Sequence, residues 1–269
     1  MKNLLKGTLL ATTLFMGSSA MAQQAISLPR PNMKAKSLTV TEALSTRHSV
    51  RQFDTTPLTL QQLSDLCWAA CGVSRNNDYR TAPSAMNKKE IRLFVFTEKG
   101  VYEYDAVANS LTQKADGDHR ELITGSANGY KQAFAKEAPV TLLMVIDFNL
   151  IGTKNERTIM MGCVDAGNVS ENINLYCQSV GLATVPRATH DTDGIRKLLA
   201  LTDNQLPIMN NPVGWPKKIT KIQNLLDNIR AKHRNKKSDV SQHPIFKNKL
   251  LKTNLLKQIK KISFLEFSK

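Results

Sequence analysis

Apolar positions recur at helical spacing in several stretches of the chain. The clearest covers residues 59–72, where Thr59 can cap the start and Gly72 can end the helix. The longest covers residues 160–180. Shorter helices are predicted over residues 37–49 and 191–201, with two more within residues 118–139.

Other stretches have the patterns of strands. Residues 140–147 are apolar almost without interruption, which is typical of a strand buried on both faces. Residues 91–105 predict two strands joined by a Glu-Lys-Gly turn, and further strands are predicted over residues 182–187 and 206–216. Helices and strands alternate only loosely. We therefore predict one α+β domain over residues 37–217, with a mixed, mostly antiparallel sheet flanked by helices.

The first 22 residues have the pattern of a secretory signal peptide. Two lysines accompany an apolar run that is too short to span a bilayer, and Ala20 to Ala22 form a small-x-small cleavage site. The mature chain is then expected to begin at Gln23, with an extended lead-in over residues 23–36, and to be exported by a Sec-type route to the periplasm. The alternative is an apolar N-terminus that is not cleaved.

The charge of the chain is concentrated at its C-terminal end. Of the formal net charge of +15, residues 217–269 carry +12, from 15 Lys or Arg against 3 Asp or Glu, which leaves +3 for the rest. No specific nucleic-acid partner is expected for the nearly neutral body. The basic extension over residues 218–269 is interpreted as a non-native segment, produced by out-of-frame or read-through coding, and as disordered or helical. The rival interpretation is a basic amphipathic helix that binds anionic lipid or nucleic acid.

Several kinds of catalytic chemistry have no motif in this sequence. There is no G-x-S-x-G, no S-x-x-K, no Walker loop and no G-x-G-x-x-G. The histidines and the four cysteines lack metal-ligand spacing, so no metal site is expected and the cysteines are interpreted as buried thiols. If the protein is an enzyme, a bound organic cofactor is expected to carry the chemistry, with no catalytic side chain of its own.

The segment "RHSVRQF", residues 47–53, has an unusual density of hydrogen-bond donors. Arg47 and Arg51 carry permanent charges that can bind phosphate oxygens, and His48 and Ser49 add donors beside them. The alternative is a solvated helix end, at which cations are favourable because of the helix dipole. Spacing alone leaves both interpretations open.

Two segments in order, "RHSVRQFDTTPLTLQQLSDLCWAACGV" and "RTAPSAMN", resemble the opening of the nitroreductase family of flavin enzymes. The resemblance continues through "GVYEYD", "APVTLLMV", "DAGNVSENINLYCQSVGLATVP" and "LPIMNNPVGWP" and covers residues 37–217. Each motif is short, and their order and spacing carry the resemblance. It implies an intertwined homodimer that binds FMN at its interface, with NAD(P)H as co-substrate.

The resemblance also implies which residues contact FMN. The phosphate and the ribityl chain are expected at Arg47, His48, Ser49 and Arg51. The partner subunit is expected to contact the flavin through Pro83, Ser84, Ala85 and Asn87. The loop at the reactive edge of the ring is expected at Pro186, Arg187 and Ala188, and Lys217 is a further phosphate ligand.

The implied function is an FMN-dependent oxidoreductase that passes a hydride from a reduced nicotinamide or another donor through flavin N5 to a nitro compound, a quinone or a similar small acceptor. This chain departs from many relatives in one loop, where Ala188 and Thr189 replace a Glu-Gly pair. A backbone contact to N5 survives that change, and we hypothesise that the Arg187 guanidinium adds positive charge near flavin N1. The alternative is an exported flavin-binding dimer that has lost turnover.

Overall fold

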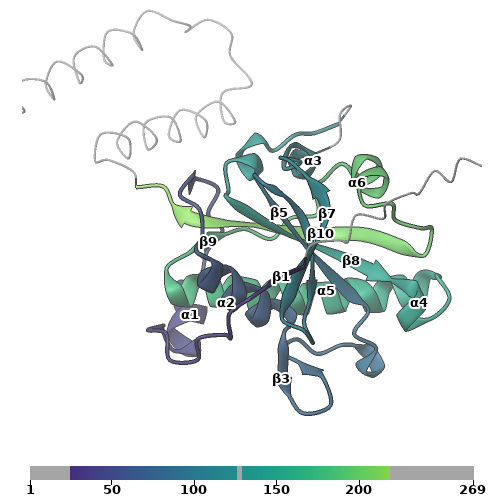
Figure 1. The fold of residues 1–269 in the computed structure, drawn as a ribbon, viewed down its shortest axis with the longest axis horizontal. Helices are drawn as coiled ribbons and strands as arrows, with labels where there is room; N and C mark the ends of the chain where they lie inside the picture. Colours follow the sequence, from purple (N-terminus) through teal and green to yellow (C-terminus); the bar gives the residue numbers. More distant parts are fainter. Residues whose placement is uncertain (1–24, 126–128, 219–269) are drawn as a thin grey trace, which may run out of the picture. The chain divides into compact units, whose positions relative to one another are not determined.

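The structure is a computed structural model that describes residues 25–125 and 129–218 (Figure 1). The expected signal peptide lies outside the described residues. The basic extension also lies outside them, apart from Lys218. The compact unit that contains the sheet ends at Lys217.

One antiparallel sheet organises the described part of the chain. Its strands follow the order β1-β7-β6-β5-β8-β10-β2, and β9 also pairs with β10. Every pairing recorded between these strands is antiparallel, whereas the sequence predicted a mixed, mostly antiparallel sheet. The strands are β1 (Ala25–Ser27), β2 (Phe53–Asp54), β5 (Ile91–Thr97), β6 (Gly100–Asp105), β7 (Ser110–Asp116), β8 (Val140–Asp147), β9 (Ala183–Thr184) and β10 (Gln205–Pro216). A separate hairpin pairs β3 (Val73–Arg75) with β4 (Tyr79–Arg80).

Helices cover both faces of this sheet (Figure 1). On the lower face in this view lie α1 (Val40–Thr46), α2 (Leu60–Cys71) and α5 (Glu156–Val180). On the upper face lie α3 (Glu121–Thr124) and α6 (Thr192–Leu198). The remaining short helices are α4 (Phe148–Ile151) and two 3-10 turns, η1 (Ala85–Asn87) and η2 (Ala133–Lys136).

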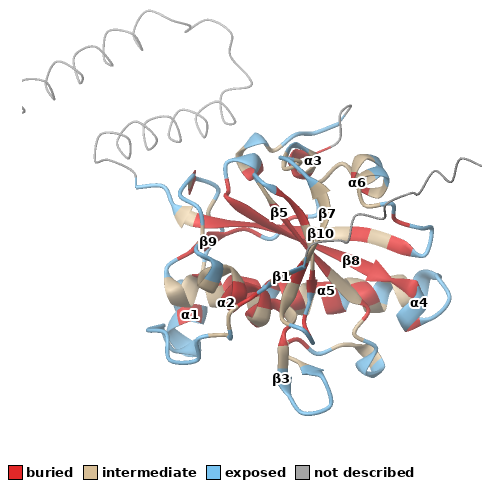
Figure 2. Cartoon of the chain, viewed as in Figure 1, coloured by how far each residue is buried: buried red, intermediate tan, exposed pale blue. Residues whose placement is uncertain are grey.

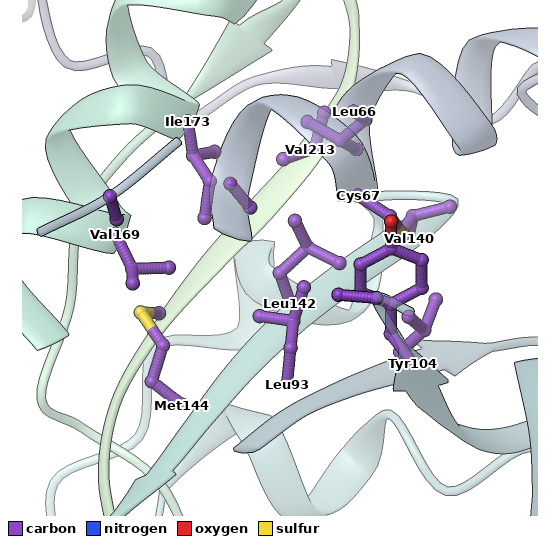
Figure 3. Close-up of a cluster of buried hydrophobic side chains, with 14 of the residues drawn as sticks. Leu66, Cys67, Leu93, Tyr104, Val140, Leu142, Met144, Val169, Ile173 and Val213 are labelled. Atoms are coloured by element: carbon purple, nitrogen blue, oxygen red, sulfur yellow. The ribbon is translucent and has the colours of Figure 1, made fainter. Parts of the chain in front are cut away.

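Strand β8 lies at the centre of the hydrophobic core, and all of its residues are buried (Figure 2). Successive side chains of a strand point to opposite faces. Leu142 and Met144 accordingly pack on the face covered by α2 and α5, in the cluster shown in Figure 3. Leu143 and Val145 pack on the face covered by α3 and α6. A strand with both faces covered must be apolar throughout, which confirms the interpretation of residues 140–147.

Capping residues explain where the helices begin and end. Thr59 caps α2 through a reciprocal bond with Gln62, and Gly72 follows its last residue, as predicted. The long helix α5 begins at Glu156, four residues earlier than predicted, because Asn155 caps it and its first turn is polar. Helix α1 ends at Thr46, so the residues that follow it are not helical. Among the described residues, no helix is both long and apolar enough to cross a membrane.

The sequence analysis missed several pairings at the edge of the sheet. The lead-in before residue 37 contributes strand β1, which pairs with β7, and its Leu28 is buried in the core. Strand β7 itself was not predicted because Ser110–Asp116 is mostly polar, with only Leu111 buried. Most residues of the two strands are only partly buried or exposed, so the apolar alternation that marks a strand is weak.

Replacing Gly162 with alanine is expected to lower the free energy of unfolding by about 1–3 kcal/mol. A Cβ atom at Gly162 would lie 2.6 Å from Cδ1 of Ile146, whose side chain is fully buried in β8. Gly167→Ala on the same helix is the matched control, because no described atom lies within 4 Å of its added Cβ. Urea denaturation of both variants tests this, and equal effects would contradict the close approach of α5 to β8.

Candidate functional site

Residues 47–54 lie along the end of the sheet, beside β9 and the last residues of β10. The amide of Val50 donates to the carbonyl of Thr184 at 3.0 Å, and the amide of Lys217 donates to the carbonyl of Gln52 at 3.1 Å. Strand β2 then pairs with Trp215 and Pro216. These bonds bring the two expected phosphate-binding positions, the 47–51 segment and Lys217, to the same corner of the sheet.

The chain takes this path because helix α1 stops and one apolar side chain turns inward. The Arg47 amide donates to the Ala43 carbonyl at 2.8 Å, and Arg47 then leaves the helical conformation. Val50 packs against the small cluster that contains Phe53 and Val185. The donor-bearing positions on either side of it, Ser49 and Arg51, stay exposed.

The corner carries positive charge that no acidic side chain neutralises within the described ranges. Arg47, Arg51 and Lys217 have no ion-pair partner among residues 25–125 and 129–218, and their side chains make no hydrogen bond there. The His48 ring contacts the Thr46 carbonyl at 3.0 Å. Unpaired guanidinium groups beside the Ser49 hydroxyl favour the binding of an oxyanion such as phosphate. We name this set, Arg47, His48, Ser49, Arg51 and Lys217, the cationic corner.

The loop after β9 lies next to the cationic corner and exposes a backbone donor. Arg187 pairs with Asn210 through its amide and its carbonyl, at 2.9 and 2.7 Å, which fixes the loop against β10. Pro186 and Ala188 on either side are exposed. The Ala188 amide donates to no acceptor in the part of the chain that the structure describes. This amide can therefore bind an acceptor atom of a ligand.

The side chain of Arg187 points into the protein, away from the solvent that Pro186 and Ala188 face. It is 6% exposed, and its guanidinium stacks over the ring of Phe134 at 5.4 Å. Its nitrogens donate to Gln132 Oε1 at 2.6 Å, Asn210 Oδ1 at 2.9 Å and the Ile123 carbonyl at 3.0 Å. Burial lowers the pKa of Arg187 to about 10. With most of its donors already used, this side chain anchors the loop.

The segment with the expected partner contacts lies on another part of α5. The Ala85 amide donates to Asp165 Oδ2 at 2.6 Å, near the middle of the helix. The cationic corner adjoins the helix end, where Gln178 Nε2 contacts Thr46 Oγ1 at 3.1 Å. At 1.5 Å per residue, Asp165 and Gln178 are about 20 Å apart along the axis. One protomer therefore does not bring Pro83, Ser84, Ala85 and Asn87 to its own cationic corner.

Two buried carboxyl groups beside this segment, Glu90 and Asp165, were not singled out by the sequence. Glu90 directly precedes β5, and Asp165 lies on the sheet side of α5. Helical spacing does place Asp165 with Val169 and Ile173, which are both buried, so periodicity could have indicated its burial. Glu90 follows two lysines, and nothing local distinguishes it from an exposed acid.

The four cysteines are free, and none forms a disulfide. Burial raises the pKa of the Cys71 thiol to about 12 and raises those of Cys67 and Cys177 as well. A thiol with a raised pKa is a poor nucleophile at neutral pH. Among the described residues, no group of three or more His, Cys, Asp and Glu side chains could hold a metal ion.

A cationic corner that no described acidic side chain neutralises, beside an exposed amide on an antiparallel α+β fold, is an arrangement suited to an anionic ligand. Comparison with known proteins gives the family. Residues 44–215 match the model of the nitroreductase family. The chain belongs to that family, and it is an oxidoreductase by class.

Individual relatives agree with this assignment. A protein of Methanocaldococcus jannaschii named "putative nitroreductase" is 29% identical over 183 residues, which cover 64% of this chain and 89% of that protein. A crystal structure described as a "putative nitroreductase" from Ralstonia eutropha is 30% identical and covers 81% of this chain and 97% of that chain, with a TM-score of 0.65. The E. coli microcin synthetase McbBCD complex with truncated pro-MccB17 bound includes a chain that is 14% identical. That match covers 78% of this chain and 85% of the other with a TM-score of 0.55, and it shows the fold alone.

Proposed function

We propose that this chain is an FMN-dependent oxidoreductase whose cationic corner binds the FMN phosphate. The observation that carries this proposal is the group of unpaired cations beside the exposed Ala188 amide, at the positions where the family resemblance places FMN. A phosphate carries nearly two negative charges at neutral pH, and Arg47 and Arg51 can each bind it through charge-assisted hydrogen bonds. Ser49 and Lys217 supply further donors.

The protein residues position and tune the cofactor in this proposal. FMN would supply hydride transfer at its N5 atom, which none of the described side chains can do. In this proposal the Ala188 amide would donate a hydrogen bond at the reactive edge of the ring, and this needs only a backbone N–H, so replacement of the Glu-Gly pair would be tolerated. The buried Arg187 side chain and its pairing with Asn210 hold that amide in place. A reduced nicotinamide is the proposed donor, and a nitro compound, a quinone or a similar small molecule is the proposed acceptor.

We also propose that the functional unit is a homodimer. The segment around Ala85 lies about 20 Å along α5 from the cationic corner of its own protomer, so a second copy is needed to bring the two together. Helix α5 exposes Met160 and Val164 on one side, where they are 61% and 60% exposed. These positions are four residues apart and form an apolar stripe on the helix surface. A partner copy would cover this stripe.

Replacing Val164 with glutamate is expected to convert the dimer into monomers and to weaken FMN binding at least tenfold. The new carboxylate would be buried without a partner in the interface, whereas the protomer core is untouched because Val164 is exposed. Val107→Glu is the matched control, because Val107 is 62% exposed in the turn between β6 and β7. Light scattering with size exclusion measures the mass, and a Val164→Glu protein that stays dimeric would contradict this interface.

The absorption spectrum of the purified chain after incubation with FMN tests the cofactor directly. A retained peak near 450 nm after desalting is expected, and its absence would sink the proposal. Anaerobic addition of NADH or NADPH then separates an enzyme from an exported flavin-binding dimer without turnover. Bleaching of the peak supports the enzyme. Bound flavin that neither nicotinamide reduces supports the flavin-binding dimer without turnover. The changed loop at Ala188 and Thr189 is the reason to test this alternative.

Export to the periplasm is a further proposal, which rests on the lysines, the apolar run and the Ala20 to Ala22 cleavage site. The intact mass of the chain recovered from a periplasmic extract measures where it starts. A mass that begins at Gln23 is expected. A chain that retains its first residues in the cytoplasmic fraction would contradict export and would favour NAD(P)H as the donor.

A further inference from the structure

Glu90 and Asp165 form a buried pair of carboxyl groups between the loop that precedes β5 and helix α5. Glu90 is 0% exposed and Asp165 is 4% exposed. Their side chains are in hydrogen-bond contact. Two ionised carboxylates can only accept hydrogen bonds, and neither Glu90 oxygen has a donor within the described part of the chain. The contact is therefore a hydrogen bond only when one of the two groups carries a proton.

The surroundings raise the pH at which this proton is lost to near neutrality. Burial, together with the hydrogen bond to Asp165 and its negative charge, raises the pKa of Glu90 to about 7. Residues at both ends of the neighbouring segment, Ala85 and Ile91, pack against an apolar cluster that contains Ile146. A pair that shares one proton is common where two carboxyl groups share a dry site.

Two hydrogen bonds hold the ends of the segment 85–90, and one of them is made by a carboxyl group of the pair. At one end, Asp165 Oδ2 accepts the Ala85 amide at 2.6 Å. At the other end, the Glu90 carbonyl accepts the Asp147 amide at 2.9 Å. Between them the backbone has positive φ angles at Met86, Asn87 and Lys89, which are unfavourable for residues other than glycine. The segment therefore depends on these outside contacts for its shape.

We propose that Glu90 and Asp165 share one proton and act as a pH-dependent positioning pair, which holds the segment 85–90 in the shape that contacts the cofactor in the partner subunit. The role in cofactor binding rests on the proposed function, because that function places this segment against FMN. The shared proton itself is a property of the protomer and does not depend on FMN. Loss of the proton places two negative charges together in a dry site and loosens the segment.

The other charged groups near the pair do not replace this proton. From β8, Asp147 faces Arg92 at 3.5 Å and accepts from Gln205 at 2.8 Å, so its charge is already compensated. On the same loop, Lys88 is exposed and Lys89 Nζ contacts the Asn77 carbonyl at 3.5 Å. Helix α5 contributes Asp165 itself. Within the described residues, no cation contacts the Glu90 carboxyl group.

The sign of the pH dependence follows from the raised pKa of Glu90. A carboxyl group whose folded pKa lies above its unfolded value of 4.5 stabilises the fold fully below pH 4.5, and this contribution is lost as the pH rises through about 7. The pair therefore makes the protein less stable above pH 7 than below pH 5. The same loss is expected in FMN affinity, because the positioned segment is what contacts the cofactor.

The variants Glu90→Gln and Asp165→Asn test the pair, because each replaces the shared proton by an amide donor that does not titrate. Melting temperatures of the wild type and both variants, without added FMN, are measured from pH 5 to pH 8.5. The wild type is expected to lose stability relative to both variants as the pH rises, and at pH 8.5 to melt about 4 °C or more below them. Glu98→Gln, at an exposed site, is the control and should follow the wild type at each pH.

Parallel melting curves for the wild type and the variants would overturn the proposal. If one variant does not fold, the other decides, since both remove the same proton. The dissociation constant of FMN, measured by fluorescence, is expected to rise about tenfold from pH 6 to pH 8.5 in the wild type and to change less than twofold in Glu90→Gln. Separating melting curves without FMN binding at any pH would support the pair and overturn the proposed function instead.

Discussion

Replacing Arg47 and Arg51 together with alanine is expected to weaken FMN binding by a factor of about 100 to 10,000. Each guanidinium would bind the phosphate through charge-assisted hydrogen bonds, and each such bond contributes about 1.5–3 kcal/mol. No acidic side chain in the described residues neutralises either group, so the charges are free to act on a ligand. Titration of the desalted apoprotein with FMN, followed by fluorescence quenching, measures the change.

The same double variant is expected to fold normally, because both side chains make no hydrogen bond or ion pair with the described protein. Its free energy of unfolding without FMN should stay within about 0.5 kcal/mol of the wild type. Arg30→Ala is the matched control, since Arg30 is an exposed arginine near the start of the described chain. If Arg30→Ala and the double variant bind FMN equally well, the cationic corner does not hold the phosphate.

Replacing Arg187 with alanine is expected to lower the free energy of unfolding by about 3–5 kcal/mol. The change removes a buried cation together with its donors to Gln132, Asn210 and the Ile123 carbonyl, and leaves those acceptors unpaired in a dry interior. The contact with the ring of Phe134 is also lost. Chemical denaturation of the apoprotein measures this effect without interference from the cofactor.

Arg196→Ala provides the comparison for that variant. Arg196 also makes two hydrogen bonds, to the Gln205 carbonyl and to Asp203, but its side chain is partly exposed and water can replace the guanidinium. Its loss should cost about 1 kcal/mol or less. Equal effects of the two replacements would contradict a structural role for Arg187. If Arg187→Ala has normal stability but an altered flavin reduction potential, the result would support the hypothesis that the Arg187 charge acts on the flavin.

The elements that the sequence predicted well are those with a strong local signal. Helix α2 has a capping threonine, an apolar face and a terminal glycine within its own residues. Strand β8 is apolar because both of its faces are covered, and that condition is visible in eight consecutive residues. Strands β1 and β7 are stabilised mainly by pairing with each other and with β6, so little of their stability is visible in their own sequences.

The candidate site shows the same division. The donors of the 47–51 segment are visible in the local sequence. Their proximity to Lys217 depends on a backbone hydrogen bond from Lys217 to Gln52, two residues that are 165 positions apart in the chain. The inward direction of Arg187 depends on Gln132 and Asn210, which no motif connects to it. The Glu90–Asp165 pair likewise arises only when η1 packs against α5. Contacts of this kind, between residues far apart in the chain, could not be predicted from one sequence.

A crystal structure of the FMN complex tests the central claim most directly. The proposed site predicts that the FMN phosphate lies within hydrogen-bond distance of Arg47, Ser49 and Arg51 of one protomer. It also predicts that the flavin ring lies against the Ala188 amide of that protomer and against the segment that begins at Pro83 in the partner. A phosphate bound elsewhere, or a flavin enclosed by a single protomer, would contradict it.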